Sequence, residues 1–248
     1  MKNIVANFDR EVASVDNLLR FDEMVVAVPI KGLNKISELA EKHNNQRIKE
    51  ESDKYLRILS NISDNHSLKS YYETIYNQCV VLLVSYFGAT LEELFRMCIP
   101  IVIQTGEPKN ILKEEVKISV QDLAKREFIL KDDYIDYLVE KNILSFQDMK
   151  NTRRTFEKYL DVILDKNQIM NNIIFGQASR HIIVHSGGRI TSKFKGQIEV
   201  ATPRTIMPEM KETGLLKYNP EEVKILGDSM KSFMQTLKGE LNKYCDDF

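Results

Sequence analysis

Apolar residues recur at steps of three and four along most of this chain, and this spacing constrains its fold more than any other feature. The spacing is typical of amphipathic helices, whose period is 3.6 residues. Strand-and-turn patterns are scarce. The six prolines interrupt the first half and the last quarter, and none falls between 109 and 202: Pro29, Pro100, Pro108, Pro203, Pro208 and Pro220. The sequence therefore predicts an all-α protein.

The clearest helix is predicted near the C-terminus. Asn219 is suited to cap it, Pro220 to take its first position, and Glu221 and Glu222 to lie at the positive end of its dipole. Apolar residues then recur at helical steps: Val223, Leu226, Met230, Phe233, Leu237, Leu241 and Tyr244.

Two strongly apolar segments predict central helices. The first begins after a possible Ser67 cap, and we expect Pro100 to stop it at about Cys98. The second, residues 168–185, closes on Gly187 and Gly188, which suit a helix C-cap. Its β-branched residues would also suit a buried strand.

Other segments carry weaker patterns. A first helix is expected over 9–27, ending before Pro29, and a solvated helix or helix pair over 33–60. Shorter helices are expected at 119–127, 131–140 and 146–165, and a small hairpin or ordered loop over 189–202. The length of 248 residues suits one domain over 66–248, with an N-terminal helical appendage over 1–65.

Composition narrows the class of protein. Thirty-five Lys and Arg against 36 Asp and Glu leave a net charge of −1, so no global field attracts nucleic acid. Three distant cysteines, Cys79, Cys98 and Cys245, form no C-x-x-C pair and fit a reducing compartment. The longest uncharged run, 74–91, contains too many polar residues for a membrane span. We expect a cytoplasmic protein with no membrane contact.

The residues best suited to chemistry lie late in the second apolar segment. His181 and His185 can exchange protons near neutral pH, and Arg180 can bind two oxygens of one phosphate. This is the minimum needed to cut an RNA phosphodiester without a metal. The histidine moves the proton, and the arginine neutralises the charge that develops on the phosphate.

Local charge supports an anionic ligand. Residues 166–198 contain no acid, where the average composition predicts about five, and five basic residues. Extending the range to Lys217 gives eight basic and three acidic residues, a charge of +5 in a chain whose total is −1. A basic patch beside a His/Arg pair is typical of a site for phosphate groups.

The Arg180-x4-His185 element on an apolar helix, followed by two glycines, resembles the R-x4–6-H motif of the HEPN superfamily (higher eukaryote and prokaryote nucleotide-binding domains). The segment Val80–Phe95 is similar to the leading core helix of that family. The resemblance extends over about residues 67–247, with an insertion at about 100–165.

The resemblance implies a four-helix up-and-down bundle, a homodimer with a shared cleft, and metal-independent endoribonuclease activity that leaves a 2′,3′-cyclic phosphate. It implies no cofactor, and a role as a toxin or anti-phage effector with a possible antitoxin or regulatory partner. Arg180 would bind the phosphate and His185 would be the general acid and base, supported by His181 and Glu92. Beyond the motif, the basic patch would hold the RNA through Arg189, Lys193 and Lys195.

Simpler interpretations remain open. His185 could merely interact with the dipole of its helix end, and Glu92 could pair with Arg96. The i,i+4 spacing of His181 and His185 suits a metal, but Ile182 replaces the glutamate of H-E-x-x-H. The chain could also be a non-catalytic HEPN module that binds nucleotides or protein partners.

Overall fold

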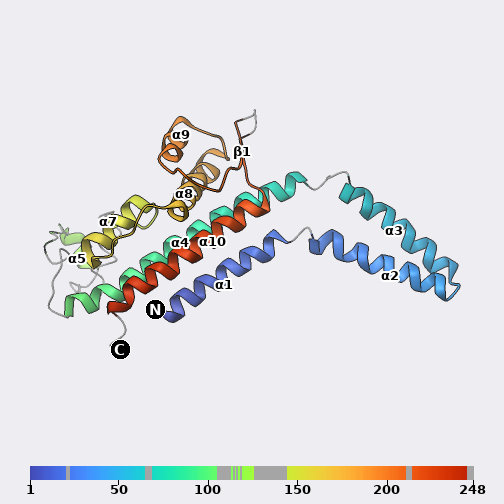
Figure 1. Ribbon diagram of the computed structural model, residues 1–248, viewed down its shortest axis with the longest axis horizontal. Coiled ribbons are helices and arrows are strands. Elements are labelled where there is room, and N and C mark those ends of the chain that lie inside the picture. Colours follow the sequence, from blue (N-terminus) through green and yellow to red (C-terminus); the bar gives the residue numbers. More distant parts are fainter. Residues whose placement is uncertain are drawn as a thin grey trace.

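The computed structural model is predominantly helical, which confirms the predicted all-α class (Figure 1). It describes residues 1–20, 23–64, 69–104, 113, 115, 117, 119–125, 144–210 and 214–244. Four long helices form the body: α1 (Lys2–Leu19), α4 (Lys69–Gln104), α8 (Gln168–Ser186) and α10 (Pro220–Leu241). A pair of helices projects from one end of this body (Figure 1).

The centre of the body is α4, which packs against α1, α8 and α10. Its middle turns bury most of their surface, with Phe87, Leu91, Leu94 and Phe95 at 0% exposure, and leave an exposed stripe at Ser85, Ala89 and Glu93. Phe87 lies between Phe8 of α1 and Phe233 of α10, at ring-centroid distances of 6.1 and 5.5 Å. Cys79 and Cys98 are also fully buried in this core, as expected of packing residues.

The four body helices alternate in direction along the chain. The amino group of Met1 donates to Sδ of Met97 at 3.0 Å, so α1 starts where α4 approaches its end. At the opposite side of the body, Asn172 of α8 donates to Ser229 of α10 at 3.0 Å, and Gly176 lies against Leu226. These pairs place α8 antiparallel to α10. Residues far apart in the sequence are thereby brought to one core.

The expectation that Pro100 stops α4 is wrong. The helix continues through this proline to Gln104. Proline removes one backbone donor from the helix, but Ile99 and Val102 beside it are at most 1% exposed. Burial of these neighbours against the body holds the last turn of the helix in place.

The first predicted helix is also divided differently. Helix α1 ends at Leu19, and a π-helical turn (Glu23–Ala27) leads into α2 (Val28–Lys42). Pro29 lies in the first turn of α2, where its missing N–H costs nothing, and not beyond the end of a preceding helix. Within the range 1–65, α1 therefore belongs to the core, and the rest projects.

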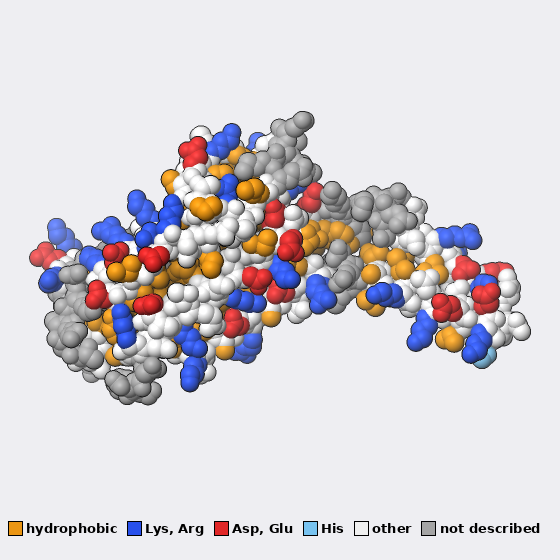
Figure 2. Space-filling view, in the orientation of Figure 1, with side chains coloured by type: hydrophobic (Ala, Val, Ile, Leu, Met, Phe, Trp, Pro, Cys, Tyr) orange, Lys and Arg blue, Asp and Glu red, His pale blue; other side chains and the backbone are white. Residues whose placement is uncertain are grey.

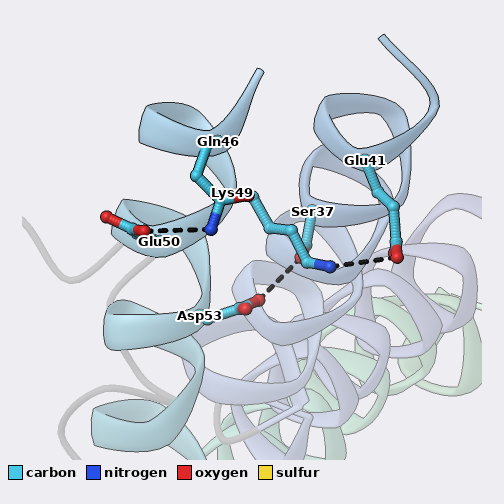
Figure 3. Close-up of polar contacts among 6 residues, drawn as sticks. All are labelled: Ser37, Glu41, Gln46, Lys49, Glu50 and Asp53. Atoms are coloured by element: carbon cyan, nitrogen blue, oxygen red, sulfur yellow. Dashed lines mark hydrogen bonds and ion pairs between the residues drawn. The ribbon is translucent and has the colours of Figure 1, made fainter. Parts of the chain in front are cut away.

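Helices α2 and α3 (Gln46–Asp64) form a helical hairpin, so the second of the two predicted alternatives, a helix pair, is the one the structure has. Polar contacts join its two arms (Figure 3). Ser37 Oγ donates to Asp53 Oδ1 at 2.6 Å, and Lys49 Nζ lies 3.0 Å from Glu41 Oε1. Hydrophobic side chains gather on the hairpin near the body (Figure 2).

Between α4 and α8, the described residues contain two helices, α5 (Val120–Lys125) and α7 (Met149–Leu160). Helix α5 confirms the helix predicted at 119–127, while the one predicted at 131–140 lies outside the described residues. The helix expected over 146–165 is shorter than predicted. Asp148 caps it by accepting from the backbone N–H of Asn151, and it ends at Asp161, whose φ is 54°.

The hairpin or loop expected over 189–202 is instead a helix, α9 (Ser192–Glu199). Thr191 caps it by accepting from the Phe194 backbone N–H, and Phe194 and Ile198, four residues apart, are its buried positions. Among the described residues of this region, strand β1 (Glu209–Met210) pairs with β2 (Leu216–Lys217), and a bridge joins Arg189 to Leu215.

The cap predicted for the last helix is confirmed. Asn219 accepts from the Glu222 N–H at 2.9 Å, and the Glu222 carboxylate accepts from the Asn219 N–H at 3.0 Å. One helical segment in the described part of the chain, Tyr72–Gln104 of α4, is long and apolar enough for a membrane span. However, 56% of its most apolar window is buried inside the protein, as in a core helix.

Candidate functional site

Helix α8 carries the Arg180-x4-His185 element to the surface. Its earlier turns are buried, with Phe175, Ala178 and Ser179 at most 5% exposed, whereas His181 and His185 are exposed. The helix ends as predicted at Gly187, whose φ is 58° and suits glycine. Gly188, at φ 80°, donates to the Ile182 carbonyl at 2.9 Å. The motif therefore occupies the last turns of a helix anchored in the core.

The two imidazoles lie against each other. His181 and His185 have ring centroids 4.9 Å apart and ring planes inclined by 53°. This contact follows from their i,i+4 spacing, which places two side chains on one helical face. The structure therefore brings both histidines to a single patch of surface.

Arg180 points to a different side of the helix. Its Nη1 lies 3.4 Å from Oε1 of Gln147, which precedes α7, and its Nε is buried with no partner among the described residues. Five residues at 3.6 per turn place Arg180 about 140° from His185 around the helix axis. Within one chain, the guanidinium and the imidazole of His185 therefore do not face the same point.

The electrostatic environment of the histidines is positive. The pKa of His181 lies below its ordinary value of 6.5, first because neighbouring atoms reduce its solvation, and then because Lys193, His185 and Arg180 carry positive charge. None of these contributions comes from an acid. The result is an imidazole that is neutral over more of the physiological pH range, as a general base requires.

The predicted RNA-binding residues are only partly brought together. Lys193 is close enough to affect the pKa of His181. Lys195 follows it by two residues on the same helix, which separates their side chains by about 200° around α9. Arg189 is exposed beside its bridge to Leu215. The helix that replaces the expected hairpin or loop therefore divides the two lysines between opposite sides.

Glu92 forms the i,i+4 pair that was the simpler alternative. Its Oε1 accepts from Nη2 of Arg96 at 2.7 Å and from Nε at 3.0 Å. Both side chains are about 30% exposed. The carboxylate is therefore engaged within α4.

Metal ligands are a separate question. In the described ranges, no group of three or more His, Cys, Asp or Glu side chains is arranged to hold a metal ion. His181 and His185 alone supply two nitrogens on one face.

Sequence reasoning missed one feature beside this site. Helix α7 carries basic residues at Lys150, Arg153, Arg154 and Lys158, and its start contacts α8 through Gln147 and Arg180. The spacing i, i+3, i+4, i+8 was a readable signal, because it places all four on one helical face. The basic stretch predicted from the sequence begins at Lys166, after this helix.

Comparison of the chain with protein-family models, with curated proteins and with solved structures finds no match. The expected resemblance to the HEPN superfamily therefore rests on the sequence alone, on the Arg180-x4-His185 element and the segment Val80–Phe95.

Proposed function

We propose that this protein is a metal-independent endoribonuclease of the HEPN type. The observation that carries the proposal is the pair of exposed imidazoles at the end of α8, surrounded by positive charge with no acidic contribution to the pKa of His181. Such a patch attracts a phosphodiester, and imidazoles exchange protons with it near neutral pH. The alternating helices α1, α4, α8 and α10 are compatible with a four-helix up-and-down core.

The proposed reaction needs no external nucleophile. The imidazole of His185 takes the proton from the RNA 2′-hydroxyl, and the oxygen of this hydroxyl attacks the adjacent phosphorus. The P–O5′ bond breaks, and the leaving oxygen takes a proton from an imidazolium. The products are a 2′,3′-cyclic phosphate and a 5′-hydroxyl. Arg180 neutralises the charge that develops on the phosphate oxygens, and His181, whose ring contacts that of His185, supports the position of this imidazole.

We propose that the enzyme is a homodimer. Arg180 and His185 are about 140° apart around one helix, so two chains facing each other supply both groups to one phosphate more readily than one chain does. A cytoplasmic toxin or anti-phage role, with an antitoxin or regulatory partner, belongs to the same proposal.

A cleavage assay on purified protein tests the chemistry. Total RNA is incubated with excess EDTA and separated on a denaturing gel, with wild type beside His185→Ala, Arg180→Ala and the control His43→Ala. His43 is an exposed histidine at the end of α2, outside the site. We expect His185→Ala to abolish cleavage, Arg180→Ala to reduce it at least tenfold, and His43→Ala to leave it unchanged.

The outcomes separate the two functional hypotheses. Cleavage that persists in His185→Ala, or that also occurs on a 2′-O-methyl RNA, contradicts the mechanism. RNA left intact by the wild-type protein favours the alternative, a non-catalytic HEPN module that binds nucleotides or protein partners. Circular dichroism of each variant excludes loss of the fold as the cause.

A further inference from the structure

A groove of about 740 Å³ lies between α7, the first turns of α8 and the end of α9. Its floor is apolar and includes Met149 and Met170, both 1% exposed, and Ile174. Its walls are strongly basic, with one acidic residue, Glu157, against five cations: Lys150, Arg153, Arg154, Lys158 and Lys166. Figure 2 shows Lys and Arg side chains gathered over α7, at the upper left of the view.

The fold holds this basic wall in place. Helix α7 is packed onto the core by Phe156 and Leu160, both 0% exposed, so its opposite face presents the cations. Lys166 donates from Nζ to the carbonyl of Val200, which joins the loop before α8 to the end of α9. The groove is therefore built from fixed helices.

One cation of the groove has an unused donor. Nε of Arg153 is buried and has no partner among the described residues. A buried guanidinium N–H without an acceptor is unfavourable, and such groups in native proteins usually have a partner. The remaining N–H groups of a guanidinium can bind two oxygens of one phosphate, which suits Arg153 to an anionic ligand in the groove.

The groove and the candidate catalytic motif both lie beside the start of α7. The backbone N–H of Met149, the first residue of α7, donates to Oε1 of Gln177 on α8 at 2.9 Å. One turn further along α8, Arg180 reaches Gln147. Arg180 therefore lies near the start of α7, and the groove cations follow along this helix, whose 12 residues span about 18 Å, the length of a few nucleotides.

We propose that this groove binds single-stranded RNA beside the point of cleavage. Its cations hold successive phosphates, and the accessible apolar side chains of Ile174 and Val200 give the unpaired bases an apolar surface. A poly-acidic peptide would also use the cations, but it would leave these apolar side chains without a partner. This inference rests on the proposed endoribonuclease function for the identity of its ligand, and it assigns the part of the substrate that the catalytic motif does not hold.

Binding measured without cleavage tests the groove. Full-length protein carrying His185→Ala is titrated into a fluorescent single-stranded RNA that is 2′-O-methylated, and anisotropy gives Kd at several salt concentrations. The groove variant adds Arg153→Gln and Arg154→Gln. The matched control instead adds Arg47→Gln and Arg57→Gln, which remove the same charge from exposed positions on α3.

We expect the groove variant to bind at least tenfold more weakly than the control. Each phosphate contact contributes about 0.7 to the slope of log K against log salt for single strands, so two lost contacts lower its magnitude by about 1.4. Equal affinity of the two variants overturns the inference. Competition by poly-glutamate as strong as that by unlabelled RNA also overturns it, in favour of an acidic protein partner.

The two proposals fail separately. If the wild-type protein cleaves RNA through His185 but the groove variant binds normally, the groove inference alone is wrong. If the groove variant loses RNA binding while the wild type cleaves nothing, the groove remains an RNA site and the endoribonuclease proposal is wrong.

Discussion

The hairpin α2/α3 and the body are both built from amphipathic helices, yet they present opposite surfaces. In the body, apolar faces close on one another and Phe8 and Phe87 are 0% exposed, whereas Val28 and Tyr55 of the hairpin are 60% and 56% exposed. An amphipathic sequence pattern indicates that a helix has an apolar face. Whether other helices cover that face depends on how many of them pack around it.

The charges of the two regions differ in the reverse sense. On the hairpin, opposite charges lie together, as in the pairs of Lys49 with Glu41 and Arg47 with Glu51. Around His181 of the body, like charges lie together, and they add to the loss of solvation in lowering the pKa of this imidazole. Paired charges solvate a surface at little cost, while an accumulation of cations creates a positive potential that attracts anions.

The largest expected difference comes from removing one aromatic ring from each region. Phe87→Ala leaves a cavity between α1, α4 and α10 and should reduce the free energy of unfolding by about 3–5 kcal/mol. Tyr55→Ala on the hairpin removes a ring that is already 56% exposed, and should change it by at most about 0.5 kcal/mol. Urea unfolding followed by circular dichroism measures both. Equal losses would show that the hairpin face is covered.

A glycine pair should give changes of opposite sign. A Cβ on Gly176 would lie 2.7 Å from Cδ1 of Leu226, which is 0% exposed, so Gly176→Ala should destabilise the contact of α8 with α10 by about 1–3 kcal/mol. A Cβ on Gly32 meets no atom within 4 Å. Gly32→Ala should therefore stabilise α2 by about 0.5–1 kcal/mol through helix propensity.

Thermal unfolding reports on Gly176→Ala, and amide hydrogen exchange of α2 reports on Gly32→Ala. If both variants shift in the same direction, the close approach of α8 and α10 is not what separates them.

A polar contact tests how far the hairpin stands alone. Ser37→Ala removes the hydrogen bond to Asp53 and should lower the free energy of local opening by about 0.5–1.5 kcal/mol. Hydrogen exchange should accelerate in α2 and α3 and stay unchanged in α10. The body control is Ser229→Ala, which removes an acceptor of Asn172 and should accelerate exchange in α8 and α10. Faster hydrogen exchange in α10 of the Ser37→Ala variant would contradict the inference that the hairpin opens independently of the body.

The smallest expected effect concerns charge in the body. Lys193→Gln removes one of the positive charges that lower the pKa of His181, so the pKa should move back toward 6.5, while Lys195→Gln, farther round α9, should move it less. NMR titration of the imidazole measures this shift. Equal shifts in the two variants would contradict the separation of the lysines.

The lowered pKa of His181 also predicts how the free energy of unfolding depends on pH. Because the pKa of His181 is lower in the folded chain than its ordinary value of 6.5, the unfolded chain binds more protons just below that pH. The contribution of His181 is therefore present above pH 6.5 and is lost as the pH falls through the folded pKa. His181→Gln should flatten the decline of stability in this range, and chemical unfolding at a series of pH values measures it.

The parts of the fold that depend on residues close together in the sequence could be predicted from it. Asn219 with Glu222 marked the start of α10, and Gly187 marked the end of α8, because caps satisfy backbone groups within a few residues. The end of α4 was missed, because Pro100 stops a helix only where nothing else holds it. Helix α9 was missed although Thr191, Phe194 and Ile198 carried its cap and its i,i+4 buried pair.

In the candidate site too, some features could be predicted from the sequence and others depend on how the helices pack. The sequence supplied Arg180, His181 and His185, and the i,i+4 rule alone predicts that the two imidazoles meet. The proximity of Lys193 to His181 and of Gln147 to Arg180 depends on how α9 and α7 pack, which no local pattern encodes.

By itself, the sequence determined that this protein is helical, where several helices are capped, and which residues are able to move a proton or bind a phosphate. Only the tertiary structure decided that α1 closes the core, that the hairpin remains open, and that α7 adds a basic groove beside Arg180. The physical reason is the separation along the chain of the residues that interact. Caps and helical faces follow from contacts within about one turn of helix, whereas burial and the summed field of the charges depend on which helices become neighbours.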